Sequence, residues 1–183
     1  MEELVNTVIV LAMHGAPPSD FPEQQLAEFF NLHSELEHAQ GKPDGSLIHR
    51  YQELEQKIRR WPRTPENDPF YAGSRDLALS LRQAAGMDIM LGFNEYCAPS
   101  LDEALQAGAR SGAGRVIVVT PMLTRGGEHA EKDIPAAVER ARLGHPGVEF
   151  IYAWPYAASD TSRFLANHLK KFSAGGKAHP ADD

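Results

Sequence analysis

Three short stretches of the sequence carry side chains that can bind a metal ion or move protons. They contain His14, Glu95 and His129, in the local sequences Met-His-Gly, Gly-Phe-Asn-Glu and Gly-Gly-Glu-His. Imidazole and carboxylate groups ligate divalent transition metals, and imidazole titrates near neutral pH. If the three side chains meet in one place, they form a site that can hold a divalent ion and also accept protons.

Each of these residues lies just past, or at the end of, a run that predicts a buried β-strand. The four expected strands cover residues 5–13, 87–96, 115–120 and 148–154. Apolar and β-branched residues dominate them, as in strands of a parallel sheet that is buried on both faces. Because the carboxyl ends of parallel strands lie at one edge of a sheet, we expect His14, Glu95 and His129 to converge there.

Helical patterns alternate with these strands, which is typical of a doubly wound α/β domain. Four of the expected helices cover residues 70–84, 100–109, 133–142 and 159–172. Ser100 and Glu103 have the spacing of a capping box at the start of the second, and Pro135 falls in the first turn of the third. The sequence therefore predicts an α/β fold with a mainly parallel, four-stranded sheet.

Residues 17–69 do not fit this alternation, and a structureless loop of that length is uncommon in a compact domain. Two amphipathic helices, at 23–39 and 46–60, fill most of the segment, with a turn at 41–45 between them. We expect a helical hairpin, inserted after the first strand, that hangs over the ligand edge of the sheet. It belongs to a single domain, 1–172, which a flexible tail, 173–183, follows.

The composition excludes several classes of protein. The chain has 183 residues, of which 42% are hydrophobic and 23% charged, and its formal net charge is -7. The negative net charge argues against a nucleic-acid surface, which needs a concentrated basic face. The apolar run from Val8 to Met13 is too short for a signal peptide or a membrane span. The single cysteine, Cys97, forms no intrachain disulfide, which favours a cytoplasmic location, and we interpret it as a small packed residue.

In order and spacing, the motifs resemble those of the sirohydrochlorin cobaltochelatase and ferrochelatase family, the class II tetrapyrrole chelatases. The matching motifs lie in residues 12–15, 92–101 and 121–135, and the whole resemblance covers 5–15 and about 70–154. Members of this family insert cobalt(II) or iron(II) into a reduced tetrapyrrole without ATP. The resemblance therefore implies Co²⁺ or Fe²⁺ and a tetrapyrrole as substrates, no nucleotide, and a role in cobalamin or sirohaem biosynthesis.

Carried over to this sequence, the resemblance assigns metal handling to His14 and His129 and places the acidic Glu95 beside them. Short members of the family hold one lobe and assemble as homodimers, which implies a homodimer here. Two features depart from the family pattern. Ala16 stands where a serine is usual after the first His-Gly, and the insertion at 17–69 is more similar to the elements that cover the macrocycle in haem-type ferrochelatases.

The loop before His129 supplies candidate substrate contacts. Arg125 is placed to orient a carboxylate-rich substrate, while Gly126 and Gly127 allow the backbone to approach a flat ligand. The plainer interpretations are a solvated Arg125 and a His129 that is only a polar residue at a helix start. The other histidines and the acidic residues of the insertion are interpreted as surface residues: His33, His38, His49, His145, His168, His179, Glu35, Glu37, Glu53 and Glu55.

Three functions fit these observations. The first is a chelatase for sirohydrochlorin or a close relative, and the second is a non-catalytic protein that binds a metal or a tetrapyrrole. The third is a chelatase for a haem-type porphyrin. The residue types do not choose the metal, because two imidazoles and a carboxylate accept cobalt, iron, nickel or zinc.

Overall fold

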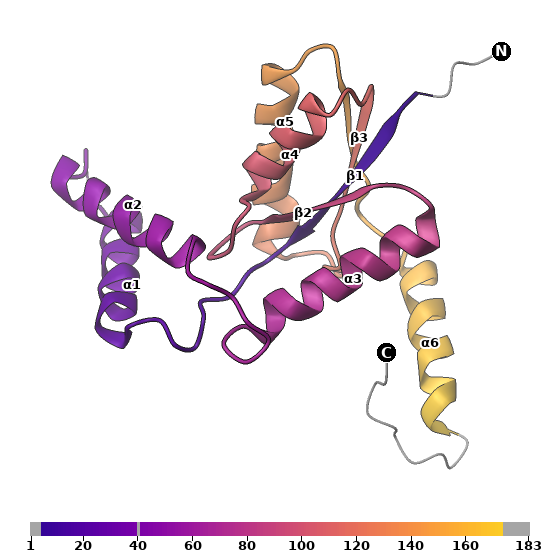
Figure 1. Ribbon diagram of the computed structural model, residues 1–183, viewed down its shortest axis with the longest axis horizontal. Helices are drawn as coiled ribbons and strands as arrows, with labels where there is room; N and C mark the ends of the chain where they lie inside the picture. Colours follow the sequence, from indigo (N-terminus) through magenta and orange to yellow (C-terminus); the bar gives the residue numbers. More distant parts are fainter. Residues whose placement is uncertain (1–4, 40, 174–183) are drawn as a thin grey trace.

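A parallel sheet forms the centre of the molecule (Figure 1), whose computed structural model describes residues 5–39 and 41–173. Its strands are β1 (Thr7–Met13), β2 (Ile89–Phe93), β3 (Arg115–Val119) and β4 (Glu149–Tyr152). They lie in the order β2-β1-β3-β4, and every neighbouring pair is parallel. The expected α/β fold and four-stranded sheet are confirmed, with the strands starting or ending slightly inside the predicted ranges.

Helices cover both faces of the sheet because successive side chains of a strand point to opposite sides. On one face, α4 (Leu101–Arg110) and α5 (Ile134–Gly144) pack over the fully buried Val10, Val116 and Val118. On the other face, α3 (Pro69–Ala85) packs against β2, where Phe93 is fully buried. The doubly wound arrangement is therefore confirmed, and its apolar burial is the main stabilising contribution to the fold.

Local capping signals fix where the helices begin at the ligand edge. The predicted capping box is present at the start of α4: Glu103 N donates to Ser100 Oγ at 3.2 Å, and Ser100 N donates to the Glu103 carboxylate at 2.7 Å. At the start of α3, Tyr71 N donates to the side chain of Asp68 at 2.8 Å. These bonds satisfy backbone groups that a helix terminus leaves without partners.

The insertion forms a helical hairpin, as predicted, from α1 (Glu23–Glu37) and α2 (Gly45–Arg59). Its helices pack on each other through an apolar cluster of their own, in which Phe29, Leu54 and Ile58 are buried. Tyr96, from the loop after β2, packs against the same cluster and joins the hairpin to the sheet edge. Figure 1 shows the hairpin to one side of the sheet, away from α6.

The last described helix, α6 (Ala158–Ser173), follows β4 and projects away from the sheet (Figure 1). None of its residues is buried. The flexible tail predicted from residue 173 lies, from residue 174 on, outside the described residues. Within the described ranges, no helix combines the length and the apolar character needed to cross a membrane.

Candidate metal and substrate site

His14, Glu95 and His129 meet at the carboxyl edge of the sheet, and one ligand atom of each lies within 4.8 Å of the others. His14 Nε2 is 3.0 Å from His129 Nε2, although 115 positions separate the two residues. Glu95 Oε2 lies 3.7 Å from His14 Nε2 and 4.0 Å from His129 Nε2. The convergence that the strand ends predicted therefore occurs.

His14 is the first residue after β1, and the close approach of two loops holds it in place. Glu95 N donates to His14 O at 2.9 Å. Gly15 has a φ of +102°, and a Cβ at this position would lie 1.9 Å from Glu95 O, so only glycine fits. His14 Nδ1 lies 2.8 Å from Gly15 O, so Nδ1–H donates a hydrogen bond to this carbonyl and Nε2 is the ring atom that faces the site.

A π-helical turn, His129–Asp133, carries the second histidine and runs directly into α5. Such turns occur often at functional sites. The turn brings Asp133 beside His129, whose Nδ1 is 2.6 Å from Asp133 Oδ2. The carboxylate accepts a hydrogen bond from Nδ1–H, which orients the ring and leaves Nε2 free to ligate.

The two Nε2 atoms, at 3.0 Å from each other, are the acceptor atoms of rings whose Nδ1 protons are directed elsewhere. Two lone pairs that face each other at this distance repel unless a proton or a cation lies between them. Two imidazole nitrogens and a carboxylate oxygen form a donor set that suits Co²⁺, Fe²⁺ and similar ions. The arrangement therefore fits a divalent transition metal.

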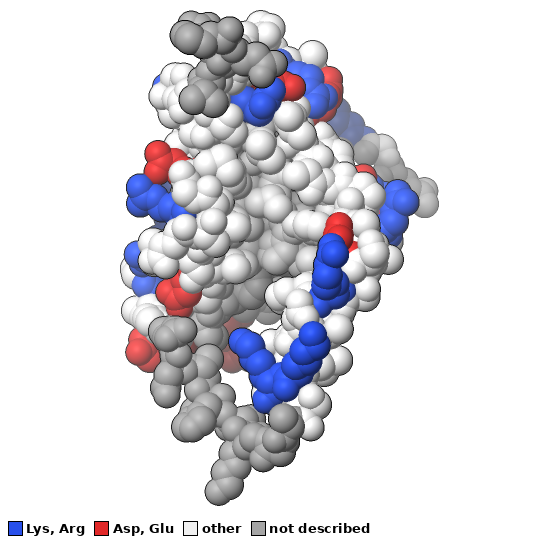
Figure 2. All heavy atoms as spheres, turned by 90° about the vertical axis from the view of Figure 1, so that its right-hand side faces the viewer, with Lys and Arg blue, Asp and Glu red and all other residues white. Residues whose placement is uncertain are grey.

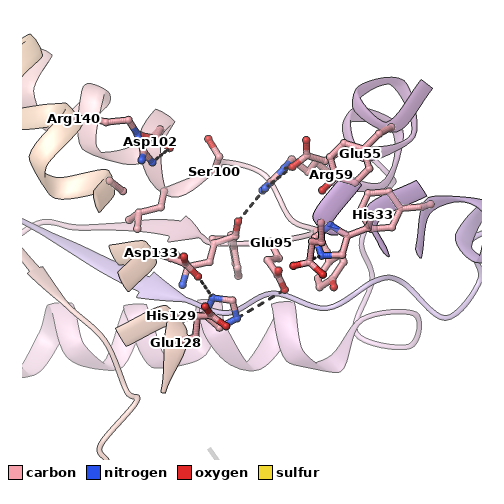
Figure 3. A pocket seen from close by; sticks show the side chains of 18 residues that line it. His33, Glu55, Arg59, Glu95, Ser100, Asp102, Glu128, His129, Asp133 and Arg140 are labelled. Atoms are coloured by element: carbon pink, nitrogen blue, oxygen red, sulfur yellow. Dashed lines mark hydrogen bonds and ion pairs between the residues drawn. The ribbon is translucent and has the colours of Figure 1, made fainter. Parts of the chain in front are cut away.

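A pocket of about 400 Å³ opens beside Glu95 and His129 (Figure 3), whereas His14 does not line it. Glu95 and His129 line it from the sheet edge, and α1 and α2 form the facing wall with His33, Tyr51 and Arg59. The rings of Phe29 and Tyr51 stack in this wall, with centroids 5.0 Å apart and an interplanar angle of 17°. The volume lies in the range of small-molecule sites.

The pocket includes residues that were interpreted as ordinary surface groups. His33, Glu37 and Glu55, from the two hairpin helices, line it. Their side chains are partly exposed, as expected of surface residues, and the structure adds that they border this pocket. Helical spacing shows which side chains share a face, but the direction in which that face points depends on how the hairpin docks.

Arg125 and Gly126, by contrast, do not line this pocket. The Arg125 side chain is 74% exposed, lies 3.7 Å from the Glu131 carboxylate and stacks over the ring of Trp154 at 5.8 Å. Gly126 N donates to Glu131 Oε1 at 2.9 Å. Gly127, in the same loop, is also absent from the lining, which begins at Glu128.

Arg59, in the last turn of α2, ties the hairpin to the loop that carries Glu95. Its guanidinium donates to Asn94 O and Cys97 O, both at 3.0 Å, and to the Glu55 carboxylate at 2.9 Å. The two carbonyl acceptors belong to Asn94 and Cys97, which lie on either side of Glu95 in the sequence. The hairpin is thereby fixed to the site through the backbone of that loop.

Arg63 makes a second connection, to both site loops. It donates to Ala16 O at 2.7 Å and to Tyr96 O at 2.5 Å, and it pairs with the buried carboxylate of Asp68. The side chains of Arg63 and Asp68 are only 6% and 1% exposed. One buried cation therefore links the segment after His14, the segment after Glu95 and the start of α3.

Burial decides the protonation of the neighbouring weak acids. It raises the pKa of Tyr51 and of Tyr96 to about 12, so both phenols are protonated near neutral pH. Burial also raises the pKa of the Cys97 thiol, and this residue is fully buried. Cys97 is confirmed as a packed residue, and its protonated thiol is a poor metal ligand.

Comparison with known proteins identifies relatives of this chain. Residues 68–167, which include Glu95 and His129, match the family model of CbiX. One similar solved structure is that of the sirohydrochlorin chelatase SirB from Bacillus subtilis subspecies spizizenii in complex with cobalt. Its sequence is 18% identical to this chain and its TM-score is 0.46; the match covers 92% of this chain and 51% of the SirB chain. A CbiX protein from Marinobacter aquaeolei VT8, assigned to cobalamin (vitamin B12) biosynthesis, is 19% identical with a TM-score of 0.43, over 91% and 95% of the two chains.

This chain thus spans about half the length of the SirB chain. No curated protein sequence matches it at a comparable level of significance.

Proposed function

The chain belongs to the CbiX family of tetrapyrrole chelatases, and we propose that it inserts a divalent metal ion, cobalt(II) or iron(II), into sirohydrochlorin or a related tetrapyrrole without ATP. The observation that carries the proposal is the meeting of His14, Glu95 and His129, with ligand atoms within 4.8 Å of one another at the edge of a pocket. The family match covers Glu95 and His129 but not His14, so the convergence of His14 with them is an observation of the structure alone, and it leads to the same chemistry.

The metal substrate is held by His14 Nε2, His129 Nε2 and Glu95 Oε2 in this proposal. Three protein ligands leave coordination positions open, and the pyrrole nitrogens of the substrate occupy them during transfer. Imidazole and carboxylate bind cobalt(II) and iron(II) less tightly than thiolates do, which suits an ion that must be passed on. The buried, protonated Cys97 stays outside this set.

Metal insertion replaces two pyrrole N–H bonds with bonds to M²⁺, so the site must accept two protons in each turnover. As the metal leaves, the Nε2 atoms of His14 and His129 become free to accept them. Asp133, 2.6 Å from His129 Nδ1, stabilises the positive charge that then develops on that ring. Both imidazoles later release their protons to water and bind the next ion.

Arg140 is our candidate for the residue that orients the substrate. It lines the pocket at the end opposite Arg59 (Figure 3), and 58% of its side chain is exposed. Its bond to Asp102, at 2.8 Å, is an exposed ion pair of small net energy, so a substrate carboxylate can replace it. Arg59 is only 12% exposed and already bonded, which leaves it a structural role.

We also propose that the hairpin is the wall or lid of the substrate pocket, as part of one domain with the sheet. His33 and Tyr51, whose rings stack on each other with centroids 5.8 Å apart, give the pocket an aromatic lining that suits a flat macrocycle. We propose in addition that the chain assembles as a homodimer, as the family resemblance implies. The lone cysteine of the sequence fits a cytoplasmic enzyme.

The proposal is tested by mixing the protein with Co²⁺ and sirohydrochlorin and following the Soret band. We expect a shift that is much faster than in a protein-free control. A tetrapyrrole that binds without being metalated would support the non-catalytic alternative instead. Turnover of protoporphyrin, with none of sirohydrochlorin, would identify a haem-type chelatase.

A further inference from the structure

Tyr96, which follows Glu95, has a backbone conformation that tyrosine rarely adopts. Its φ is +55°, and within the described ranges every other residue with a positive φ is a glycine. Cys97 N donates to Glu95 O at 2.6 Å, so the three residues form a γ-turn with a positive φ at its centre, which is the rarer and more strained type. Such strain persists only where surrounding contacts hold the residue in place, and it is concentrated at functional sites.

The Tyr96 ring lies at the junction between the sheet edge and the hairpin. It packs against the apolar cluster of the hairpin and also against the cluster between α3 and the sheet, which contains Met13 and Phe93. The hairpin helices α1 and α2 pack mainly on each other, beside the sheet (Figure 1). The bonds of Arg59 and Arg63 hold only backbone carbonyls of the connecting loop, whereas the Tyr96 ring joins the side chains of the two parts.

One of the proposed metal ligands lies against this ring. The rings of Tyr96 and His14 stack, with centroids 6.4 Å apart and an interplanar angle of 22°. Phe29 and Phe30, both from α1, meet the Tyr96 ring at steep angles, with centroid distances of 6.2 and 6.3 Å. These separations lie within the range of favourable aromatic pairs. The ring that the hairpin holds is therefore also the ring that the His14 imidazole rests on.

A second proposed ligand, Glu95, is close to the Tyr96 phenol. Burial first, and then the negative charge of the Glu95 carboxylate, raise the pKa of Tyr96 to about 12, and both side chains line the pocket. The backbone of the turn is fixed as well, because Tyr96 O accepts a bond from the buried Arg63 guanidinium at 2.5 Å. The position of the phenol ring is thus set by both its backbone and its neighbours.

We propose that Tyr96 is a positioning residue of the metal site, whose ring holds the His14 imidazole with Nε2 toward His129 and links this orientation to the docking of the hairpin. A glycine would adopt the same φ without strain, so the contacts of the ring are what a tyrosine adds at this position. The inference rests on the proposed function, which takes His14, Glu95 and His129 as the metal ligands. It gives the hairpin a second role, because a displacement of the hairpin then changes the affinity of the site for its ion.

Binding of Co²⁺ alone, measured by titration and by the visible spectrum of the bound ion, reports on this site without a tetrapyrrole. In the described part of the chain, His14, Glu95 and His129 are the one group of three possible ligands close enough to share an ion. On the side of the molecule opposite the hairpin, the visible acidic side chains lie apart from one another, mostly toward the margins (Figure 2). That side therefore offers no competing cluster of carboxylates.

Tyr96→Leu keeps apolar bulk at the junction and removes the ring from His14. We expect the Kd for Co²⁺ to rise about 10–100-fold and the spectrum to change, as for other contacts that orient a metal ligand. Tyr96→Phe keeps the ring and should restore both properties to nearly wild-type values. Tyr71→Leu is the matched control, because Tyr71 stacks on Phe93 at 5.5 Å and does not line the pocket.

The control should leave cobalt affinity and spectrum unchanged, and circular dichroism checks that the variants fold. Wild-type affinity and spectrum in Tyr96→Leu would overturn the proposal. Equal losses in Tyr96→Phe and Tyr96→Leu would also overturn it, since they would assign the effect to the hydroxyl group. An equal loss in Tyr71→Leu would reduce the effect to general destabilisation and count against the proposal.

A double-mutant cycle tests the link to the hairpin. Phe30 contacts the Tyr96 ring, but it is 42% exposed and does not line the pocket. Phe30→Ala should weaken cobalt binding by about 2–5-fold in the wild-type background, the lower end of coupling between residues in contact, and should have no effect in Tyr96→Leu. The same loss in both backgrounds, or no loss in the wild type, would contradict the link. The wild-type arm decides the question even if Tyr96→Leu does not fold.

None of these measurements uses metal insertion. A protein whose cobalt site depends on Tyr96 but that does not metalate a tetrapyrrole would refute the proposed function alone. A chelatase whose cobalt site is indifferent to Tyr96 and Phe30 would refute this inference alone.

Discussion

The backbone of Gly15 lies so close to Glu95 that a Cβ atom on Gly15 would stand 1.9 Å from the Glu95 carbonyl oxygen. This contact sets the separation of the loops that carry His14 and Glu95, which also share the bond from Glu95 N to His14 O at 2.9 Å. A metal site built from two loops depends on such a fixed separation, because ligand geometry tolerates little displacement.

Gly15→Ala should therefore push the two loops apart and weaken metal binding. Since backbone must move, we expect a loss of about 2–4 kcal/mol of unfolding free energy. Cobalt titration and thermal unfolding measure the two effects. Gly112→Ala is the matched control, because Gly112 also has a positive φ, +83°, but nothing lies within 4 Å of its added Cβ. It should cost about 1 kcal/mol and leave cobalt affinity unchanged; equal cobalt affinities for the two variants would refute the role given to the contact.

The second prediction concerns the two metal-facing histidines. His14→Ala and His129→Ala should each abolish metalation, because each removes a ligand and a proton acceptor whose Nε2 faces the other ring at 3.0 Å. The fold should survive, since 44% and 23% of these side chains are exposed. His38→Ala, at an exposed position on the hairpin, is the control. Wild-type turnover in either site variant, with unchanged circular dichroism, would exclude the assignment.

Asp133→Asn should lower metal affinity by about 10–100-fold without removing a ligand, because the amide is a poorer acceptor for the Nδ1 proton of His129. The visible spectrum of the Co²⁺ complex should change, since the ring loses its fixed orientation. Glu128→Gln removes the ion pair with Lys132 at the pocket wall, leaves the contact between Asp133 and His129 intact and serves as a control for cobalt binding. An unaltered cobalt spectrum and affinity in Asp133→Asn would show that the contact does not orient the ring.

Arg140→Ala should raise KM for the tetrapyrrole and leave kcat and cobalt affinity nearly unchanged, because Arg140 is proposed to hold a substrate carboxylate far from the metal. A loss of one charge-assisted bond corresponds to about 1.5–3 kcal/mol, or roughly 10–100-fold in KM. Arg125→Ala tests the alternative on the loop before His129. If Arg125→Ala raises KM and Arg140→Ala does not, the substrate lies over that loop and outside the described pocket.

Asp68→Asn should destabilise the fold by about 3–5 kcal/mol, because it leaves the Arg63 guanidinium buried without its counter-charge. The same change should loosen both site loops, which Arg63 contacts through Ala16 O and Tyr96 O. Arg82→Gln removes an exposed pair with Asp88 and should alter stability by less than about 0.5 kcal/mol. Denaturant unfolding measures both variants, and similar losses would contradict the special role of the buried pair.

Much of the fold was predictable because its signals are local. The strands are short apolar runs, the capping box of Ser100 and Glu103 lies within four residues, and the hairpin helices show their apolar spacing directly. The meeting of His14, Glu95 and His129 was predictable for a general reason. Parallel strands bring their carboxyl ends to one edge, so residues distant in sequence become neighbours once the strands are recognised.

The rest of the site depends on contacts between segments that are distant in the sequence, and no local sequence pattern predicts these contacts. The docking of α1 and α2 on Tyr96 determines which side of the hairpin faces the pocket. The position of His33 in the pocket wall follows from this docking. Arg59 and Arg63 act on backbone carbonyls, which every residue has, so no residue type marks their partners. The spacing of His129 and Asp133, four residues, is compatible with a helical contact, but only the structure shows that the Asp133 carboxylate lies at His129 Nδ1 and leaves Nε2 facing His14.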